Sequence, residues 1–249
     1  SEYDHGVFMI TTGNHMDMRF MEEFAATSGK PALYAAHFHY PHEPDRGRRL
    51  MRDAEAARSR GHAVYTQGSC QPLSLGFTLD DAYILKMIEG WPSTSDHVEL
   101  RRVFSDPGFR DGLRATLSVP DGARVFNGRW EWVILTRAGS EALADLEGKS
   151  VEEIAALRGV DALDCFLDLA LEDDFESYFT LYMLNMEEDG VEELITNDGT
   201  LISLSDAGAH NSLLCDAGYA VHLLSRWVRE KGTFDLPTAI RKLTSDPLS

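Results

Sequence analysis

The sequence is poor in cysteine and in positive charge, and it contains no long apolar run. Its three cysteines, Cys70, Cys165 and Cys215, form neither a disulfide framework nor a zinc-knuckle spacing, which favours a reducing compartment. There are 23 Lys and Arg residues against 41 Asp and Glu residues, a formal net charge of -18. This deficit argues against nucleic acid as a partner. No apolar run could span a bilayer and no signal peptide is visible, so we expect a cytoplasmic protein that binds no membrane.

A glycine-rich phosphate loop following a strand is also missing, which weakens the case for dinucleotide binding. The composition is otherwise typical of a globular protein, with 43% hydrophobic and 26% charged residues among 249. A chain of this length fits one large α/β domain or two small ones.

Strand-like and helix-like segments alternate along much of the chain. Compact apolar or β-branched runs predict strands, and amphipathic segments with stop or capping residues predict helices. The predicted strands span 7–12, 32–39, 63–67, 130–135, 179–184 and 201–206, and the predicted helices span 17–28, 46–60, 161–174, 187–195, 212–230 and 235–244. Residues 80–150 are less regular, and we expect them to form an insertion within one domain over 1–249. Ser150 and Glu153 predict a capping box at a helix start.

Repeated strand–helix units imply parallel strands joined by right-handed crossovers, which permits either an open doubly wound sheet or a closed barrel. A barrel of this class needs eight strands, whereas five of the predicted strands are good candidates for it. We therefore expect the first barrel strands to lie before Ser1.

The most informative stretch is Ser205–His210, where an aspartate ends an apolar strand and small residues follow at once. Barrel active sites lie at such strand ends, so Asp206 is a candidate catalytic carboxylate and His210 a candidate substrate contact. The alternative is a turn-forming aspartate that caps the next helix.

His37 and His39 flank one residue in the second predicted strand. Residues two apart in a strand point the same way, so both imidazoles can face one ligand. Zinc is commonly held by histidine nitrogens. The alternative is that one or both are satisfied core or rim histidines without a metal.

The third predicted strand ends in the same manner, at Gln67 and the loop that follows it. Gln67 and Ser69 are candidate substrate contacts there. Cys70 is a candidate soft ligand or nucleophile, but no base lies near it in the sequence. A small buried side chain is the simpler interpretation of Cys70.

The segments 204–210, 215–217, 227–230 and 239–247 together resemble the last barrel unit of the N-acyl-D-amino-acid deacylase branch of the amidohydrolase superfamily. His37, preceded by two alanines, resembles the fifth-strand histidine of that family, and 106–110 is similar to another of its segments. The likeness runs over nearly the whole chain, with the C-terminal motifs the most specific.

This resemblance implies a TIM-type (β/α)8 metal-dependent hydrolase barrel, of which the chain forms the C-terminal two-thirds, about strands four to eight. It implies one or two zinc ions, with His37 as a ligand and Asp206 as general base and acid. His39, from its spacing to His37, and Asp206 are further candidate ligands. The implied reaction is hydrolysis of a small-molecule substrate, the amide bond of an N-acyl amino acid, D-configured or not, or a similar small amide.

Several features of the family pattern are missing from the sequence. No paired histidines precede His37, Gln67 stands where much of the superfamily carries a sixth-strand histidine, and the first predicted strand has no lysine to serve as a carbamylated ligand. The flanking β-sandwich segments are missing as well. Two alternatives therefore stay open. One is a non-catalytic or metal-poor barrel remnant that binds a small molecule or a partner chain, and the other is an open α/β enzyme with Cys70 as nucleophile.

Overall fold

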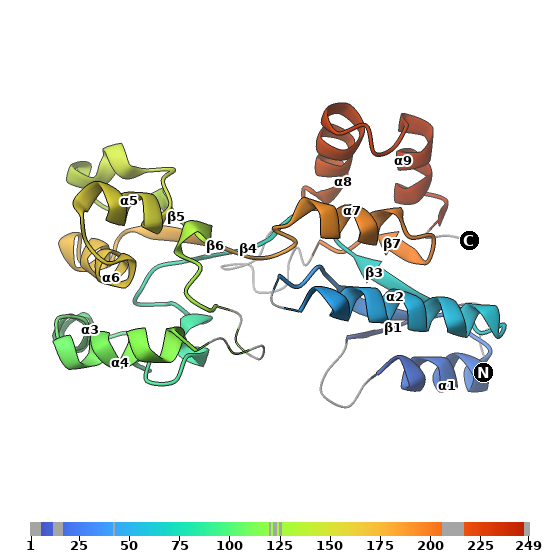
Figure 1. Ribbon diagram of the computed structural model, residues 1–249, viewed down its shortest axis with the longest axis horizontal. Helices are drawn as coiled ribbons and strands as arrows, with labels where there is room; N and C mark the ends of the chain where they lie inside the picture. The colour runs from blue at the N-terminus through green and yellow to red at the C-terminus, as the bar shows by residue number, and fades with distance from the viewer. Residues whose placement is uncertain are drawn as a thin grey trace. The chain divides into compact units, whose positions relative to one another are not determined.

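The computed structural model describes residues 6–11, 17–41, 43–119, 121, 124, 126–205 and 217–246. These residues divide into two compact units, each with its own sheet and helices (Figure 1). Unit 1 comprises the described residues of 1–73, 184–205 and 217–246, and unit 2 comprises those of 74–183. The interval 80–150, expected as an insertion, lies wholly inside unit 2.

Unit 1 is built on a four-stranded parallel sheet with the order β1-β2-β3-β7. Its strands are β1 (Phe8–Thr11), β2 (Ala32–His37), β3 (Val64–Gly68) and β7 (Thr200–Ile202). Strand order follows chain order, so every crossover steps in the same direction. A doubly wound sheet would instead reverse its order at a switch point. The sheet is therefore singly wound, as in a (β/α) barrel, and its four strands are half the number that a closed barrel needs.

Three helices cover one face of this sheet: α1 (Met18–Ser28), α2 (Pro44–Ser59) and α7 (Glu188–Thr196). Helix α1 packs against α2, and α2 packs against α7. The Asp17 carboxylate accepts the Phe20 amide at 2.9 Å and so caps the start of α1, and Gly29 ends the helix with φ at 65°. The core between helices and strands contains Met18, Met21, Ala25, Ala32, Tyr34, Ala54, Ala57 and Val64.

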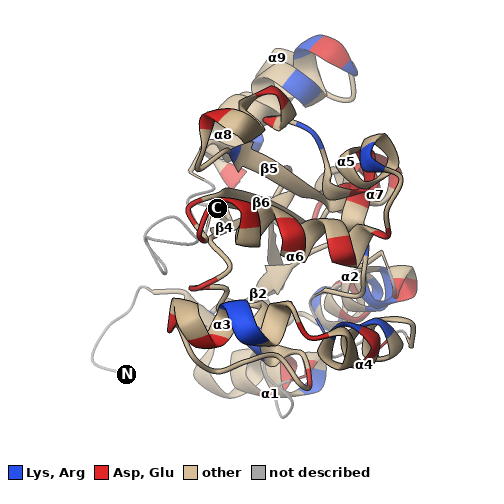
Figure 2. Ribbon diagram, turned by 90° about the vertical axis from the view of Figure 1, so that its left-hand side faces the viewer, with Lys and Arg blue, Asp and Glu red and all other residues tan. Residues whose placement is uncertain are grey.

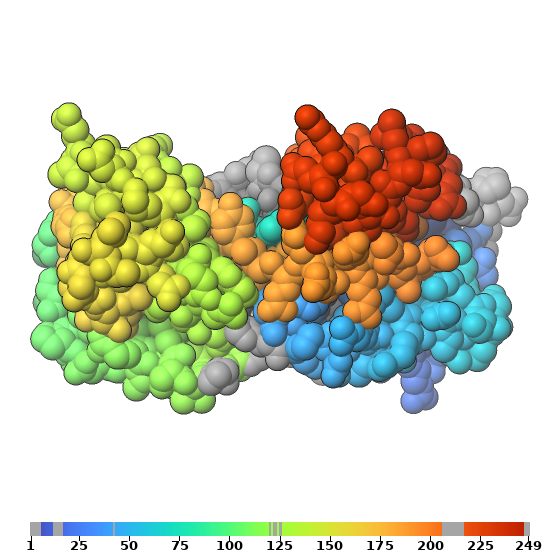
Figure 3. Space-filling view, turned by 45° about the horizontal axis from the view of Figure 1, so that its top comes forward, coloured from blue at the N-terminus to red at the C-terminus, as the bar shows by residue number. Residues whose placement is uncertain are grey.

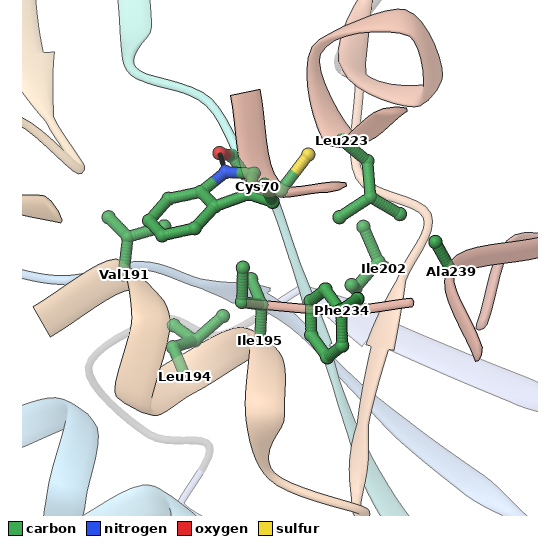
Figure 4. Close-up of a cluster of buried hydrophobic side chains, with 9 residues drawn as sticks. Cys70, Val191, Leu194, Ile195, Ile202, Leu223, Phe234 and Ala239 are labelled. Atoms are coloured by element: carbon green, nitrogen blue, oxygen red, sulfur yellow. Dashed lines mark hydrogen bonds between the residues drawn. The ribbon is translucent and has the colours of Figure 1, made fainter. Parts of the chain in front are cut away.

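The C-terminal helices lie beside α7 on the surface of unit 1 (Figure 3), and a second core lies where they meet α7 and β7 (Figure 4). These elements are α8 (Tyr219–His222), the π-helix η4 (Leu223–Glu230) and α9 (Leu236–Leu243). Buried Trp227 donates its indole N–H to the Cys70 carbonyl at 2.7 Å. On the surface, Arg226 donates twice to the Glu188 carboxylate, at 2.6 and 2.9 Å, which connects η4 to α7. The single helix predicted over 212–230 is thus, in its described part, a short α-turn continued by a π-helix.

Unit 2 has a three-stranded sheet with the order β4-β6-β5. Its strands are β4 (Leu73–Phe77, whose first residue lies in unit 1), β5 (Val133–Arg137) and β6 (Tyr178–Leu184). The strand predicted over 179–184 is found as β6, but it departs from the parallel pairing expected of the strand–helix units, because β6 pairs antiparallel with β5. An apolar run indicates a buried strand but carries no information on its partner's direction. The predicted strand 130–135 begins only at Val133, after a 3-10 turn (η2, Trp130–Trp132).

Capped helices surround the unit 2 sheet. They are α3 (His97–Phe104), α4 (Pro107–Leu117), α5 (Val151–Arg158) and α6 (Ala162–Glu172), with two further 3-10 turns, η1 (Leu85–Met87) and η3 (Glu141–Leu146). The predicted capping box at the start of α5 is confirmed, because Ser150 and Glu153 exchange both side-chain-to-backbone bonds. Acidic residues follow one another along α6 (Figure 2), and Arg110 of α4 binds two of them, Asp164 at 3.2 Å and Asp168 at 2.5 Å.

Aromatic rings fill the interior of unit 2. Phe166 of α6 lies 5.1 Å from Phe179 and 5.2 Å from Trp130 between ring centroids, and Phe77 lies 6.1 Å from Phe179. Stacked, tilted and edge-to-face pairs at these distances add to the stabilisation from apolar burial. In neither unit does a described helix have the length and apolar character needed to cross a membrane.

Candidate active site at the carboxyl ends of the parallel strands

His37 is the last residue of β2 and is completely buried. Neither of its ring nitrogens has a hydrogen-bond partner among the described residues. Burial lowers the pKa of His37 to about 4, and a weak contact with the Gly47 backbone, too poorly aligned to count as a hydrogen bond, opposes this to a smaller extent. The imidazole is therefore neutral at neutral pH, and this is the form in which histidine binds a metal ion.

A glycine in α2 makes room for this imidazole. A Cβ atom on Gly47 would lie 3.3 Å from His37 Nε2. The register pairs His37 with Gly68, and a Cβ on Gly68 would meet Leu194 of α7 at 2.6 Å. Paired residues of parallel strands point to the same face, so His37 lies on the side of the sheet that the helices cover. The register of β2 shifts between Tyr34 and His37, which brings both side chains to this side.

His39 lies two residues beyond the end of β2 and is also buried. Its ring packs so closely on Gly190 of α7 that any Cβ there would clash with it. The Nε2 atom is 3.7 Å from Glu187 Oε2, and Nδ1 has no partner within the described ranges. His37 thus packs against α2 and His39 against α7, because β2 ends at His37 and the strand alternation stops there. In the described part of the chain, no three His, Cys, Asp or Glu residues form a group that could hold a metal ion.

Gln67 and Ser69 belong to the end of β3 and the loop that follows. The Gln67 side-chain amide donates to Ser203 Oγ at 3.0 Å, whereas its buried Oε1 lacks a partner in the parts of the chain that are described. The Ser69 hydroxyl bonds within its own turn, to the backbone of Gln71 at 3.3 Å. Gln67 therefore has an unused acceptor at this rim, and Ser69 holds the loop.

Asn185, which the sequence analysis did not single out, connects these strand ends. Its side chain bonds to the backbone of His39, Ser69 and Gln71. The sequence pattern that could have identified Asn185 is the one that identified Asp206, a polar residue at the end of an apolar strand-like run.

Asp206 and His210, the remaining predicted site residues, lie outside the described residues. The chain approaches them along β3, because the amides of Ser203 and Leu204 both reach the Gly68 carbonyl at 3.3 Å. Cys70, the alternative nucleophile, is buried, and its thiol contacts the Tyr219 carbonyl at 3.1 Å. Burial raises the pKa of the Cys70 thiol to about 12, which disfavours the reactive thiolate.

Solved structures share this fold, although no protein-family model and no curated protein sequence matches the chain. A D-aminoacylase with a binuclear metal centre is 17% identical with a TM-score of 0.50, over 97% of this chain and 41% of that one. A mutant D-aminoacylase in complex with copper chloride is 16% identical with the same TM-score, over 97% and 41%. The N-acyl-D-glutamate deacylase from Bordetella bronchiseptica, complexed with zinc and a phosphonate that mimics the tetrahedral intermediate, is 16% identical with a TM-score of 0.48, over 95% and 39%.

The two likenesses with a TM-score of 0.50 show the class of fold, which is mixed α/β. Within that class the structures it is similar to are D-aminoacylases, which confirms at the level of fold the resemblance inferred from the sequence. The chain spans about two-fifths of the length of these solved chains.

Proposed function

We propose that the protein is a metal-dependent hydrolase that cleaves the amide bond of an N-acyl amino acid, D-configured or not, or of a similar small amide. The observation that carries the proposal is the singly wound sheet, similar in fold to D-aminoacylases, whose strand β2 ends on a buried, neutral histidine without a hydrogen-bond partner among the described residues. On this proposal the sheet is the C-terminal part of a (β/α)8 barrel, and the carboxyl ends of its strands face the substrate.

The described residues fit a zinc site in part. His37 supplies a neutral, buried imidazole with both nitrogens unused within the described ranges, and this suits zinc, which binds histidine nitrogen. His39 offers one unused nitrogen. These two and Asp206 are the proposed ligands of one or two ions, and further ligands would come from residues beyond the described set. Bound zinc lowers the pKa of its water to about 7 and polarises a carbonyl.

The protein's own residues would handle the substrate and the proton. Asp206 accepts a proton from the attacking water and returns it to the leaving amine. Gln67 Oε1 is a buried acceptor without a partner in the described chain, so it is suited to an N–H donor of the substrate. His210 is the further proposed contact, and Ser69 contributes by fixing the loop after β3.

The test uses the protein in its full natural length, loaded with zinc and assayed on N-acyl-D- and N-acyl-L-amino acids. Asp206→Asn should lower kcat by about 10²–10⁴-fold with an unchanged thermal midpoint of the metal-free protein, since it removes the proton carrier and alters one proposed zinc ligand. The control is Asp198→Asn, an exposed aspartate in the turn before β7, which should keep kcat within twofold. Activity of Asp206→Asn within a few-fold of the unmutated protein would remove its role, and zinc-loaded protein inactive on every amide would defeat the proposal.

A second candidate function is a metal-poor barrel that binds a small molecule without catalysis. The observation in its favour is that the two imidazoles pack against different helices and no cluster of three ligands exists in the described residues. Zinc-dependent turnover of any amide by the full-length protein would eliminate this candidate.

A further inference from the structure

Asn185 occupies a strained and buried position at a junction in unit 1. It directly follows β6 and precedes α7, and only 2% of its surface is exposed. Its φ angle is 59°, in the left-handed region that most residues avoid and that asparagine adopts more readily. A buried amide in such a conformation needs hydrogen bonds to offset its loss of water.

Both side-chain N–H groups of Asn185 and its side-chain oxygen form hydrogen bonds to the backbone just beyond the ends of two parallel strands. Its Oδ1 accepts the His39 amide at 2.7 Å, and its own backbone N–H donates to the His39 carbonyl at 3.1 Å. Its Nδ2 donates to the carbonyls of Ser69, at 2.9 Å, and Gln71, at 3.1 Å. One residue therefore connects the segment after β2 with the loop after β3.

The connected segments are the continuations of the strands that carry the proposed site. His39 lies two residues after His37, and Ser69 lies two residues after Gln67. None of these bonds lies within a helix or between two strands of the sheet, so the sheet does not require them. Their effect is to fix the backbone that follows the proposed metal ligand relative to the backbone that follows the proposed substrate contact.

Resting on the proposed function, we infer that Asn185 is a positioning residue of the active-site rim. It holds the segments after β2 and β3 together, and so fixes the backbone of His37, whose side chain lies on the helix-covered side of the sheet, relative to that of Gln67, whose side chain lies on the opposite side. It acts through these residues and does not touch the reacting atoms. Aspartate cannot replace it, because a carboxylate has no hydrogen to donate and would face the two carbonyl oxygens of Ser69 and Gln71.

The experiment measures zinc affinity, by competition with a chelator, together with kcat and KM of the zinc-loaded full-length protein. Asn185→Asp keeps the size of the side chain and the bond from the His39 amide but removes both donated bonds. We expect a 10–100-fold loss of zinc affinity or of kcat/KM, the range found when residues that orient metal ligands are changed.

The matched control is Thr66→Val, which breaks the buried bond between the Thr66 and Thr200 hydroxyls, 2.9 Å apart, in the same sheet but without contact to Asn185. It should lower the thermal midpoint while leaving zinc affinity and kcat/KM within threefold. Should Asn185→Asp not fold, Asn185→Gly replaces it, because glycine accepts the left-handed backbone. In that variant the His39 amide, deprived of its acceptor, should also exchange hydrogen faster.

The outcomes separate the two proposals. Unmutated protein that neither binds zinc nor hydrolyses any amide defeats the proposed function and the positioning role with it. An active protein whose Asn185→Asp variant retains zinc affinity and kcat/KM within twofold defeats the positioning role alone. Equal losses in Thr66→Val and Asn185→Asp would reduce Asn185 to a general structural role and would also overturn the inference.

Discussion

The two units differ in what they do with their buried polar groups. In unit 2 the polar atoms serve folding, as where Arg110 is bound by Asp164, Asp168 and the Phe104 carbonyl. Its buried side-chain atom without a partner among the described residues is Asp173 Oδ1. Unit 1 has four such atoms, on His37, His39 and Gln67, and all three residues lie at or just beyond the ends of parallel strands.

This contrast indicates where binding capacity remains. Leaving a buried donor or acceptor without a partner costs roughly 1–3 kcal/mol, so folding alone gives no reason to keep such groups at these strand ends. Residues that violate the rules of stable packing are expected at functional sites. Among the described residues, unit 1 therefore holds most of the buried polar atoms that could still bind a ligand, whereas those of unit 2 are, with the exception of Asp173 Oδ1, hydrogen-bonded within the unit. Four substitutions test this comparison.

The largest effect is expected in the aromatic core of unit 2. Phe166→Ala removes a ring that is 1% exposed and contacts Phe77, Phe179 and Trp130. It should lower the free energy of unfolding by about 3–5 kcal/mol, through lost burial and the cavity left behind. Urea unfolding followed by near-ultraviolet circular dichroism measures the loss. The control Leu157→Ala, 67% exposed on α5, should change it by about 0.5 kcal/mol or less. Equal losses in the two variants would mean that this core does not stabilise unit 2.

His37→Leu should have the opposite effect on stability. It replaces a buried imidazole without a partner in the described residues by an apolar side chain of similar size, so the metal-free protein should gain about 1–3 kcal/mol. Zinc binding should fall at the same time. Denaturant unfolding with and without zinc measures both effects.

Thr66→Val provides a reference for the change in stability that His37→Leu causes in the metal-free protein. It leaves the Thr200 hydroxyl buried without its partner and should destabilise by about 1–3 kcal/mol. If His37→Leu destabilises the metal-free protein as much as Thr66→Val does, the imidazole is a satisfied core residue and the contrast between the units disappears.

The smallest effect concerns the surface bond between η4 and α7. The bond to Arg226, with a further contribution from Lys231, lowers the pKa of Glu188 from 4.5 to about 2. Because the folded-state pKa lies below the unfolded one, the stabilisation is complete above pH 4.5 and is lost as the pH falls through about 2. The Glu188 side chain is 39% exposed, so Glu188→Gln should cost about 1 kcal/mol or less at pH 7. Unfolding at pH 7 and pH 2 should show the difference between the two proteins shrinking toward zero, and a difference that grows in acid would contradict the assignment.

The sequence predicted the local features well. The Ser150–Glu153 capping box is confirmed, and the strand predicted over 63–67 is found as β3, because caps and apolar alternation depend on a few neighbouring residues. The parallel direction of β1, β2, β3 and β7 also follows from the strand–helix alternation, whereas their order was left open between a doubly wound sheet and a barrel. The antiparallel pairing of β6 with β5 could not be predicted, because it joins strands separated by the whole of 138–177.

The candidate site was predictable in its residues but not in its geometry. The spacing of His37 and His39 predicts a shared direction only while the strand continues, and β2 ends at His37. The side chains then diverge to α2 and α7. Asn185 was missed because its role depends on a left-handed backbone angle and on carbonyls more than 110 residues away in the sequence.

The contacts of Gly47 and Gly190 have a consequence for engineering this protein. Alanine in place of a helical glycine commonly stabilises a helix, by up to about 1 kcal/mol. At Gly112 of α4 nothing lies within 4 Å of the added methyl group, so alanine there should give this stabilisation. At Gly190 the methyl group would collide with the His39 ring, and at Gly47 it would approach His37. A stabilisation programme can therefore exchange the first glycine freely and must spare the other two.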